Sequence, residues 1–379
     1  MEITVNSFIS NSDAPWKRFF RILIISLISL FTAGYLFVLG VDPYGIIPIS
    51  FSKDRGFATD PRFFLPNLAK RPQFDSAIIG TSTVRLLNPK DLNPLLNGRF
   101  VNLALNAAFL FEQEAILDVF LRHHSQPKFV IFGVDHVNFF NGDNYAQFIG
   151  GVPENFPVWL YDESFFNDLL PYNWRSIQHA VKQLRSITGM NPFKYRSDGY
   201  EDFTKRHPYD IDRVRNIIYG SSTPQAKVPV QPPVIKTPEL LKTFQFPAVR
   251  HLDRMLGRLP DATLKIVIIP PFHHFHQATP GSTDDIKWEE FKRHVVDATC
   301  RYENSILIDY MIKSPITTAD ENFLDQIHYT VPVAKKIARS IAREVVSQTI
   351  SPNYLRYCTC IKDEPAQTAV LDDCGFRGQ

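Results

Sequence analysis

A run of twenty uncharged residues, Ile22–Val41, constrains this chain more than any other feature of its sequence. A helix of about 20 apolar residues is long enough to span the hydrocarbon core of a bilayer. Three cations, Lys17, Arg18 and Arg21, precede the run. Because positive charge is retained on the cytoplasmic side, we expect the N-terminus in the cytoplasm and residues 42–379 outside.

A cleaved signal peptide and a buried core helix are the two alternatives to a spanning helix. A signal peptide has an apolar region of only about 7–15 residues and a cleavage site of small residues. The sequence after Gly40, Val-Asp-Pro-Tyr-Gly, offers no such site. We therefore expect an uncleaved anchor, with a cytoplasmic segment 1–18, a transmembrane segment 19–41 and a linker 42–73.

The composition of the whole chain is that of a globular protein. The chain has 379 residues, enough for one large domain with an insertion. Its hydrophobic fraction of 44% is ordinary, and its formal net charge of +2 lacks the basic footprint of a nucleic-acid-binding protein.

The first motif with chemical content follows a short apolar run, Ala77–Ile79, which has the length of a buried strand. Gly80 ends the run, and Thr81, Ser82 and Thr83 come next. Active crevices of open α/β sheets lie at the carboxyl ends of strands, and backbone N–H groups there can stabilise a developing negative charge. Ser82 is thus a candidate nucleophile; the alternative is that it only caps a helix.

The second motif is Asp325-Gln326-Ile327-His328, directly before a helical pattern. A hydroxyl nucleophile needs a base, and the base needs an orienting acid. The spacing lets the Asp325 carboxylate accept a hydrogen bond from Nδ1–H of His328 and leaves Nε2 to face a serine. The alternative is that the pair caps the last helix.

The order Ser82, Asp325, His328, with the last two adjacent, resembles the SGNH (GDSL-like) hydrolase superfamily. That family carries its serine after the first strand and Asp-x-x-His before the last helix. The resemblance covers roughly residues 72–140 and 262–348 and implies a Ser-His-Asp triad.

Five short apolar runs separated by helical patterns predict a parallel sheet between helical layers. Together with the resemblance, they imply a flavodoxin-like three-layer α/β/α sandwich with a five-stranded parallel sheet over residues 74–349. The expected strands begin near Ala77, Phe100, Lys128, Leu264 and Ser305, and Val331–Gln348 is expected to form the closing helix.

The resemblance also implies oxyanion donors. In the family, a glycine after the second strand donates its N–H; this chain has Ala107 or Ala108 there. We expect an alanine to replace glycine only if its φ is negative. The family's Gly-x-Asn-Asp block follows the third strand, where only Asn138 could donate, displaced in register; the alternative is that Asn138 is a loop residue.

Three histidines occur in Phe272-His273-His274-Phe275-His276, directly after the fourth expected strand. This loop should overhang the same crevice as Ser82, so we expect His273 or His274 to contact substrate. No cysteine or carboxylate pattern supports a zinc site, and we expect neither metal nor cofactor.

Residues 141–260 do not resemble the core. They are aromatic at first and proline-rich over 224–238, which predicts an inserted helical and irregular subdomain over the crevice. The tail 350–379 contains Cys358, Cys360 and Cys374, and on the outer side of a membrane these can form disulfides whose pairing the sequence does not fix.

Several membrane-anchored SGNH proteins of bacterial envelopes, including those of alginate O-acetylation and teichoic-acid D-alanylation, are similar to this arrangement. The resemblance implies an esterase or O-acyltransferase on acyl esters of cell-envelope glycans. It also implies a single-pass protein of the cytoplasmic membrane, its C-terminal domain facing the periplasm or exterior, with a membrane-bound acyltransferase as a possible partner. The alternative is a non-catalytic anchored protein that binds glycan or an assembly partner on a degenerate SGNH scaffold.

Overall fold

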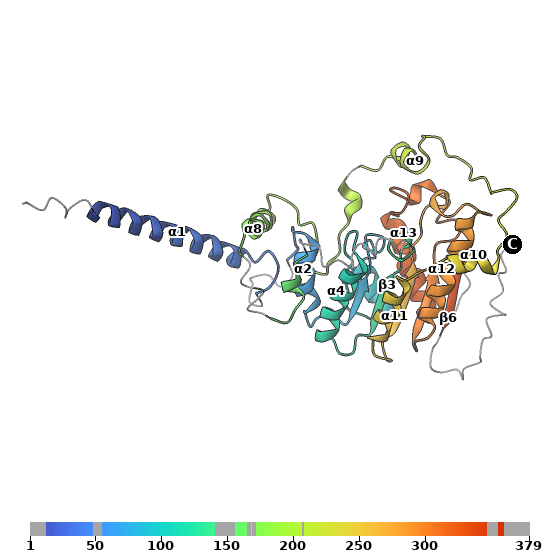
Figure 1. Cartoon of the computed structure of the whole chain (residues 1–379), viewed down its shortest axis with the longest axis horizontal. Coiled ribbons are helices and arrows are strands. Elements are labelled where there is room, and N and C mark those ends of the chain that lie inside the picture. Colours follow the sequence, from blue (N-terminus) through green and yellow to red (C-terminus); the bar gives the residue numbers. More distant parts are fainter. Residues whose placement is uncertain are drawn as a thin grey trace, which may run out of the picture.

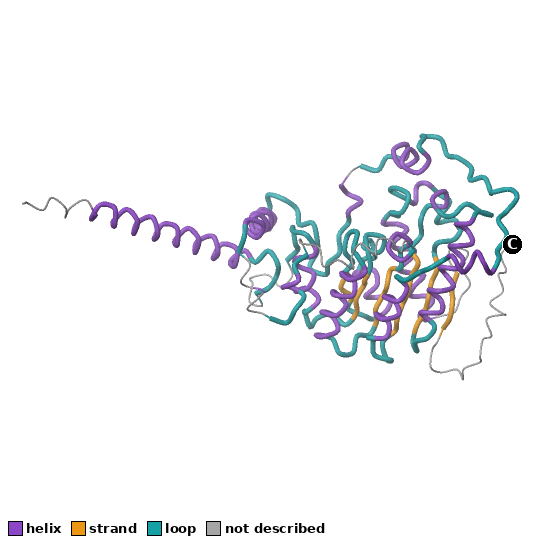
Figure 2. Tube along the Cα trace, viewed as in Figure 1, coloured by secondary structure: helices purple, strands orange, loops and turns teal. Residues whose placement is uncertain are grey.

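A computed structural model describes residues 13–47, 55–140, 156–164, 168, 172–206, 208–346 and 355–359 of the chain. Its centre is a six-stranded sheet with the order β2-β1-β3-β4-β5-β6 (Figure 2). The first five strands are parallel, as the sequence predicts, and β6 pairs antiparallel with β5. The strands are β1 Ser76–Ile79, β2 Phe100–Asn102, β3 Phe129–Gly133, β4 Leu264–Ile269, β5 Ser305–Asp309 and β6 Leu355–Thr359.

Helices connect the strands and cover the sheet (Figure 1). The α-helices that the argument uses are α1 Asp13–Val41, α2 Pro61–Ala69, α3 Pro89–Leu96, α4 Leu110–His123, α5 His136–Phe139, α8 Trp174–Ile187, α9 Ile211–Tyr219, α10 Pro238–Thr243, α11 Val249–Gly257, α12 Thr283–Thr299 and α13 Val331–Val346. Four short 3₁₀ helices are described as well: η1 Val158–Leu160, η2 Phe203–Arg206, η3 His274–His276 and η4 Asp320–Asn322.

Alternation along the strands sends apolar side chains to two cores, one on each face of the sheet. In β1, Ala77 and Ile79 join a core with α2, α4, α11 and α12, whereas Ile78 joins a core with α3, α9 and α13. The strands are buried on both faces, as expected of a parallel sheet. Their near-continuous apolar runs follow from this double burial.

The N-terminal helix α1 projects away from the rest of the molecule (Figure 1). Residues 15–41 of this helix are long and apolar enough to cross a membrane, with a mean hydropathy of 2.5, and little of the apolar window is buried. A core helix would be mostly buried, so that alternative does not apply to α1. At its C-terminal end, α1 packs against α8.

The residues predicted as an insertion, 141–260, have more than one structural role. Helix α8 packs against the end of α1, whereas α9 contacts η3 and η4 next to the sheet. Helix α11 packs against α4 and α12, and its residue Leu252 is part of the core. Residues 141–155 lie outside the described residues.

Strand β6 lies in the tail that the sequence predicted only as a polar, cysteine-containing segment. Cys300, at the C-terminal cap of α12, is disulfide-bonded. Cys360 and Cys374 lie outside the described residues.

Candidate active site

Ser82 lies in the turn that leaves β1, at the carboxyl end of the parallel strands. Gly80 makes this turn possible, because its φ of +150° is a conformation that other residues rarely adopt. A Cβ at Gly80 would stand only 2.7 Å from Cγ2 of Val84 and 3.3 Å from Cα of Gly133 in β3. The glycine therefore lets two strand ends approach each other where the serine emerges, half-buried.

Asp325 and His328 share a tight loop closed by the Leu324 N–H, which donates to the His328 carbonyl at 2.8 Å. Oδ1 of Asp325 accepts the backbone N–H groups of Ile327 at 2.9 Å and His328 at 2.8 Å. This is an Asx-type turn, in which a side chain replaces backbone partners. Phe323 and Tyr329 are buried on either side of the loop, in the core that includes α13, and thereby anchor it.

These two segments bring the three predicted side chains together. Nδ1 of His328 lies 2.8 Å from Oδ2 of Asp325, and Nε2 of His328 lies 2.8 Å from Oγ of Ser82. An ionised carboxylate can only accept, so Nδ1 carries the proton, and Nε2 is left to accept from the Ser82 hydroxyl. The geometry expected for these three side chains is confirmed, although Ser82 and His328 are 246 positions apart in the chain.

The surroundings of Asp325 favour its charged form. Burial opposes ionisation, but the hydrogen bond and charge of His328, with the two backbone N–H groups, outweigh it and hold the pKa of Asp325 below its ordinary value. The carboxylate is therefore ionised at neutral pH, as an orienting acid must be. The side chains of His328 and Asp325 remain partly exposed, which leaves the histidine accessible to a ligand.

A second hydrogen bond joins the ends of β1 and β3. Oγ of Thr81 donates to Oδ2 of buried Asp135 at 2.7 Å, and the same oxygen accepts the Thr83 N–H at 3.3 Å. Asp135 lies two residues after the end of β3. The Asp135 carboxylate thus holds Thr81, and Thr81 in turn holds Thr83, so the residues on both sides of Ser82 are fixed.

Ala107, a predicted oxyanion donor, lies in the loop after β2 with a φ of +46°. The expectation that an alanine there needs a negative φ is wrong, because the chain adopts the left-handed, glycine-type conformation with an alanine. Within the described part of the chain, the N–H groups of Ser82 and Ala107 have no hydrogen-bond partner, so both are available as donors. Asn138 belongs to α5, but its side chain lies outside the described residues.

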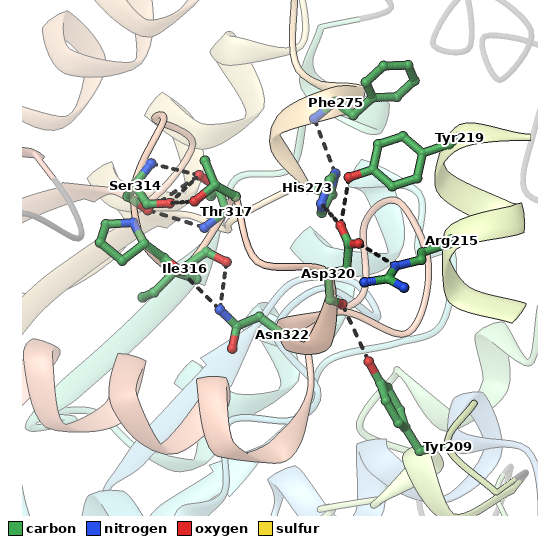
Figure 3. Close-up of polar contacts among 12 residues, drawn as sticks. Tyr209, Arg215, Tyr219, His273, Phe275, Ser314, Ile316, Thr317, Asp320 and Asn322 are labelled. Atoms are coloured by element: carbon green, nitrogen blue, oxygen red, sulfur yellow. Dashed lines mark hydrogen bonds and ion pairs between the residues drawn. The ribbon is translucent and has the colours of Figure 1, made fainter. Parts of the chain in front are cut away.

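His273, predicted to contact substrate, has a structural role instead. Its ring is buried, Nδ1 accepts the Phe275 N–H at 3.2 Å, and Nε2 lies 3.2 Å from Oδ1 of Asp320 (Figure 3). Burial lowers the pKa of His273, against the charge of Asp320. Because both ring nitrogens are occupied, the assignment of His273 to substrate binding is corrected.

His274 does not supply a clear substrate contact either. Its backbone N–H donates to the Thr317 carbonyl at 2.7 Å, and its Nδ1 is buried without a hydrogen-bond partner among the described residues. Burial lowers the pKa of its imidazole, followed by the charge of Lys227.

Asp320 is the centre of a network that the sequence did not reveal (Figure 3). Its carboxylate accepts from Nε of Arg215 at 2.8 Å and from the Tyr219 hydroxyl at 2.6 Å, in addition to the contact with His273. Burial opposes ionisation of Asp320, but the hydrogen bonds of Tyr219 and Arg215 hold its pKa below the ordinary value. The network ties α9 to the 3₁₀ turn that precedes the triad loop.

Two further histidines, His136 and His276, were not among the residues predicted to contact substrate. The side chain of His276 is exposed at the surface; partial burial of its imidazole, followed by the charge of Lys227, lowers its pKa against the charge of Asp325. His136 follows β3, and burial lowers the pKa of its imidazole to about 4, helped by His276 and Lys287. His276 is the better candidate for a substrate contact than His273, because its side chain is exposed whereas that of His273 is buried.

Phe203 of η2 covers the triad from the side of the predicted insertion. Its ring meets that of His328 edge-on, with the centroids 5.6 Å apart. A cavity of about 380 Å³ lies elsewhere, lined by residues that include Arg62, Phe109 and Glu112. It adjoins the loop of Ala107, because Arg62 donates to the carbonyl of Asn106 at 3.1 Å.

Among the residues that the structure describes, no three histidine, cysteine or carboxylate side chains gather as a metal site. No protein-family model matches this chain, and no curated protein matches it either.

Proposed function

We propose that this protein is an SGNH-like serine esterase or O-acyltransferase that acts on acyl esters of cell-envelope glycans. The observation that carries the proposal is the chain of two 2.8 Å hydrogen bonds from Ser82 through His328 to Asp325. Such a chain gives a serine hydroxyl the base that it needs to become a nucleophile.

The reaction has two steps, acylation of Ser82 and transfer of the acyl group to an acceptor. Oγ of Ser82 attacks the ester carbonyl while Nε2 of His328 takes the hydroxyl proton. The tetrahedral intermediate collapses, the alcohol leaves with the proton from His328, and the acyl group remains on Ser82. Water or a glycan hydroxyl then gives its proton to Nε2 of His328 and attacks the acyl carbonyl. As this second intermediate collapses, the bond between the acyl carbon and Oγ of Ser82 breaks, His328 returns the proton to Oγ, and the free acid or the new ester leaves. Asp325 keeps the imidazole oriented and stabilises its charged form.

The Ser82 and Ala107 N–H groups are the proposed oxyanion donors. A tetrahedral intermediate places negative charge on the former carbonyl oxygen, and preorganised N–H groups stabilise it. The left-handed conformation of Ala107 supports this role, because strained backbone tends to persist where function requires it.

The strand order 2-1-3-4-5 of the parallel strands is that of flavodoxin-like sheets, with ligands bound at the carboxyl ends. This order supports a flavodoxin-like three-layer sandwich as the catalytic fold. The proposed location is the cytoplasmic membrane, with α1 as a single-pass anchor. The cations before its apolar run support a catalytic domain that faces the periplasm or cell exterior.

Covalent labelling of the full-length protein by a fluorophosphonate probe tests the nucleophile. We expect labelling of the wild type and none of Ser82→Ala or His328→Ala. Asp325→Asn should keep its fold and lose on the order of 10⁴-fold in turnover of short acyl esters, as in other serine hydrolase triads. Ser221→Ala, a serine variant in the loop after α9, is the matched control and should label fully.

Activity on acylated glycans then separates the two reaction types. Release of free acid with water as acceptor indicates an esterase, whereas transfer to a glycan hydroxyl indicates a transferase. If Ser82→Ala, His328→Ala and Asp325→Asn all retain wild-type function in cells, the triad is not catalytic and the non-catalytic anchored binding protein is correct.

A further inference from the structure

Helix α8 has three distinct faces, although it was expected only as part of an insertion over the crevice. One face is buried in the protein and includes His179, Ala180 and Gln183. Its N-terminus is closed by a capping box, in which Asn173 accepts the Ser176 N–H at 3.0 Å. The helix is therefore a stable element with a defined orientation, and its outer surface has a fixed pattern.

The outer surface of α8 is apolar on one flank. Trp174, Ile177, Val181 and Leu184 follow each other at steps of three and four residues, which aligns them along the helix. Trp174 is 71% exposed, and Val181 and Leu184 are exposed too. Beyond the helix end, the side chain of Met190 is 74% exposed as well. An exposed apolar strip of this kind marks an interaction surface.

The neighbouring flank is basic. Arg175, Lys182 and Arg185 recur at steps of seven and three residues, and α8 contains no acidic residue. A helix with a polar side rich in lysine and arginine and an apolar side with tryptophan and leucine is typical of helices that lie in a membrane interface.

The position of α8 indicates what its apolar flank contacts. Ile177 and Ala180 pack against the cluster that contains Val38 and Val41, the last apolar residues of α1. The apolar flank therefore adjoins the spanning helix at its outer end. Figure 1 shows α8 almost end-on beside α1, so the axis of α8 runs across that of α1. If α1 crosses a bilayer, α8 therefore lies parallel to the bilayer surface.

Tyr172, just before α8, adds an interfacial aromatic contact. Its ring meets those of Phe31 and Tyr35 of α1 edge-on, with centroid distances of 4.7 Å and 5.9 Å. Tyrosine and tryptophan are enriched at the headgroup level of membranes. Tyr172 and Trp174 thus mark the depth at which the bilayer surface meets the protein.

We propose that α8 is an interfacial helix that lies on the bilayer surface around α1, with its apolar flank among the acyl chains and its basic flank on anionic headgroups. This second attachment fixes the catalytic domain at one height and orientation above the membrane, which a single flexible anchor would not. The proposal requires α1 to span the membrane and is independent of the chemistry of Ser82.

Quenching of Trp174 fluorescence by a brominated lipid in nanodiscs tests whether α8 contacts lipid. The full-length Trp16→Phe protein is incorporated with phosphatidylglycerol and a phosphatidylcholine brominated near the headgroup. The Trp174 signal is its emission minus that of the Trp16→Phe, Trp174→Phe protein. We expect the brominated lipid to remove most of this signal. Ile235→Trp in the doubly substituted protein is the control, because Ile235 is 78% exposed in the α9–α10 connection, and its introduced indole should not be quenched.

Charge reversal tests the basic flank separately. Lys182→Glu with Arg185→Glu should reduce the quenching of Trp174 severalfold in anionic nanodiscs and leave it unchanged in purely zwitterionic ones. If Trp174 is quenched no more than the control indole, α8 does not contact lipid, and its apolar flank belongs to a protein partner. If charge reversal has no effect, the anionic headgroups are not its ligands.

Discussion

Ala107 holds a left-handed backbone conformation in the loop after β2, with a φ of +46°. For an L-residue with a Cβ this conformation costs roughly 1–2 kcal/mol. The neighbouring Phe109 N–H donates to Oε2 of Glu112 at 2.8 Å, and Glu112 pairs with Arg62. These contacts fix the loop from its far end and hold Ala107 in a conformation that it does not prefer.

Substitution Ala107→Gly should therefore stabilise the protein. The left-handed strain is relieved, but the unfolded glycine has more freedom to lose, so we expect a net gain of about 0.5–1 kcal/mol in the free energy of unfolding. Urea denaturation of the detergent-solubilised protein measures it. Probe labelling of Ser82 should be retained, because the N–H stays in place. Ala108→Gly is the control in the same loop and should not stabilise; a loss of stability in Ala107→Gly would contradict the strain.

At the scale of elements, α9 and the turn η4 are connected through one carboxylate. Asp320 of η4 accepts from Arg215 and Tyr219 of α9, and Gln326 of the triad loop donates to the Ile217 carbonyl at 3.0 Å. The helix from the predicted insertion is thereby attached to the segment that leads to Asp325 and His328. We infer that α9 positions the triad loop rather than contacting the reacting atoms.

Substitution Asp320→Ala should destabilise the protein by about 2 kcal/mol, because it leaves buried polar groups such as His273 without a partner. It should also slow the reaction at Ser82 while leaving the pH profile of the triad unchanged, since Asp325 is intact. Asp212→Asn, which removes an exposed carboxylate from the same helix α9, should be close to neutral. Equal activity of Asp320→Ala and wild type would exclude a positioning role.

The pKa of Asp320 adds a check on the same network. Because its folded pKa lies below the ordinary value of 3.8, its contribution to stability is present above pH 3.8 and is lost as pH falls further. The difference in unfolding free energy between wild type and Asp320→Ala should therefore shrink only below about pH 3.8.

At the scale of the whole molecule, α1, α8 and the sheet follow one another along its long axis (Figure 1). His136, just after β3, is partly buried in this arrangement. His136 stacks on Trp288 with a centroid distance of 4.5 Å, and burial lowers the pKa of its imidazole to about 4, followed by the charges of His276 and Lys287. Because the unfolded state binds a proton at higher pH, the folded protein should lose stability as pH falls from about 6.5 to 4.

Substitution His136→Phe should remove part of this acid sensitivity. Linkage predicts that His136 alone accounts for about 1–2 kcal/mol of the stability lost between pH 7 and pH 5. Thermal or urea unfolding at both pH values, with wild type and variant in the same detergent, measures the difference. If the variant loses as much stability as the wild type over this range, His136 is not held neutral in the fold.

The elements that the sequence predicted correctly are those specified by local pattern. The uncharged run Ile22–Val41 specifies α1, and five apolar runs specify the parallel strands. The spacing of Asp325 and His328 specifies their hydrogen bond, because three residues in a tight loop bring a carboxylate to Nδ1. Ser82 could be named because a strand followed by Gly80 leads to a turn at the carboxyl end of the sheet.

Contacts distant in sequence decided the rest. His273, His274 and His276 are nearly equivalent in the sequence, and only the position of Asp320 shows that His273 is a structural residue. Strand β6 could not be predicted from its polar tail, because an edge strand takes its partner from β5. The place of α8 beside α1 depends on a few apolar contacts across about 140 residues, and no local pattern encodes that these two helices meet.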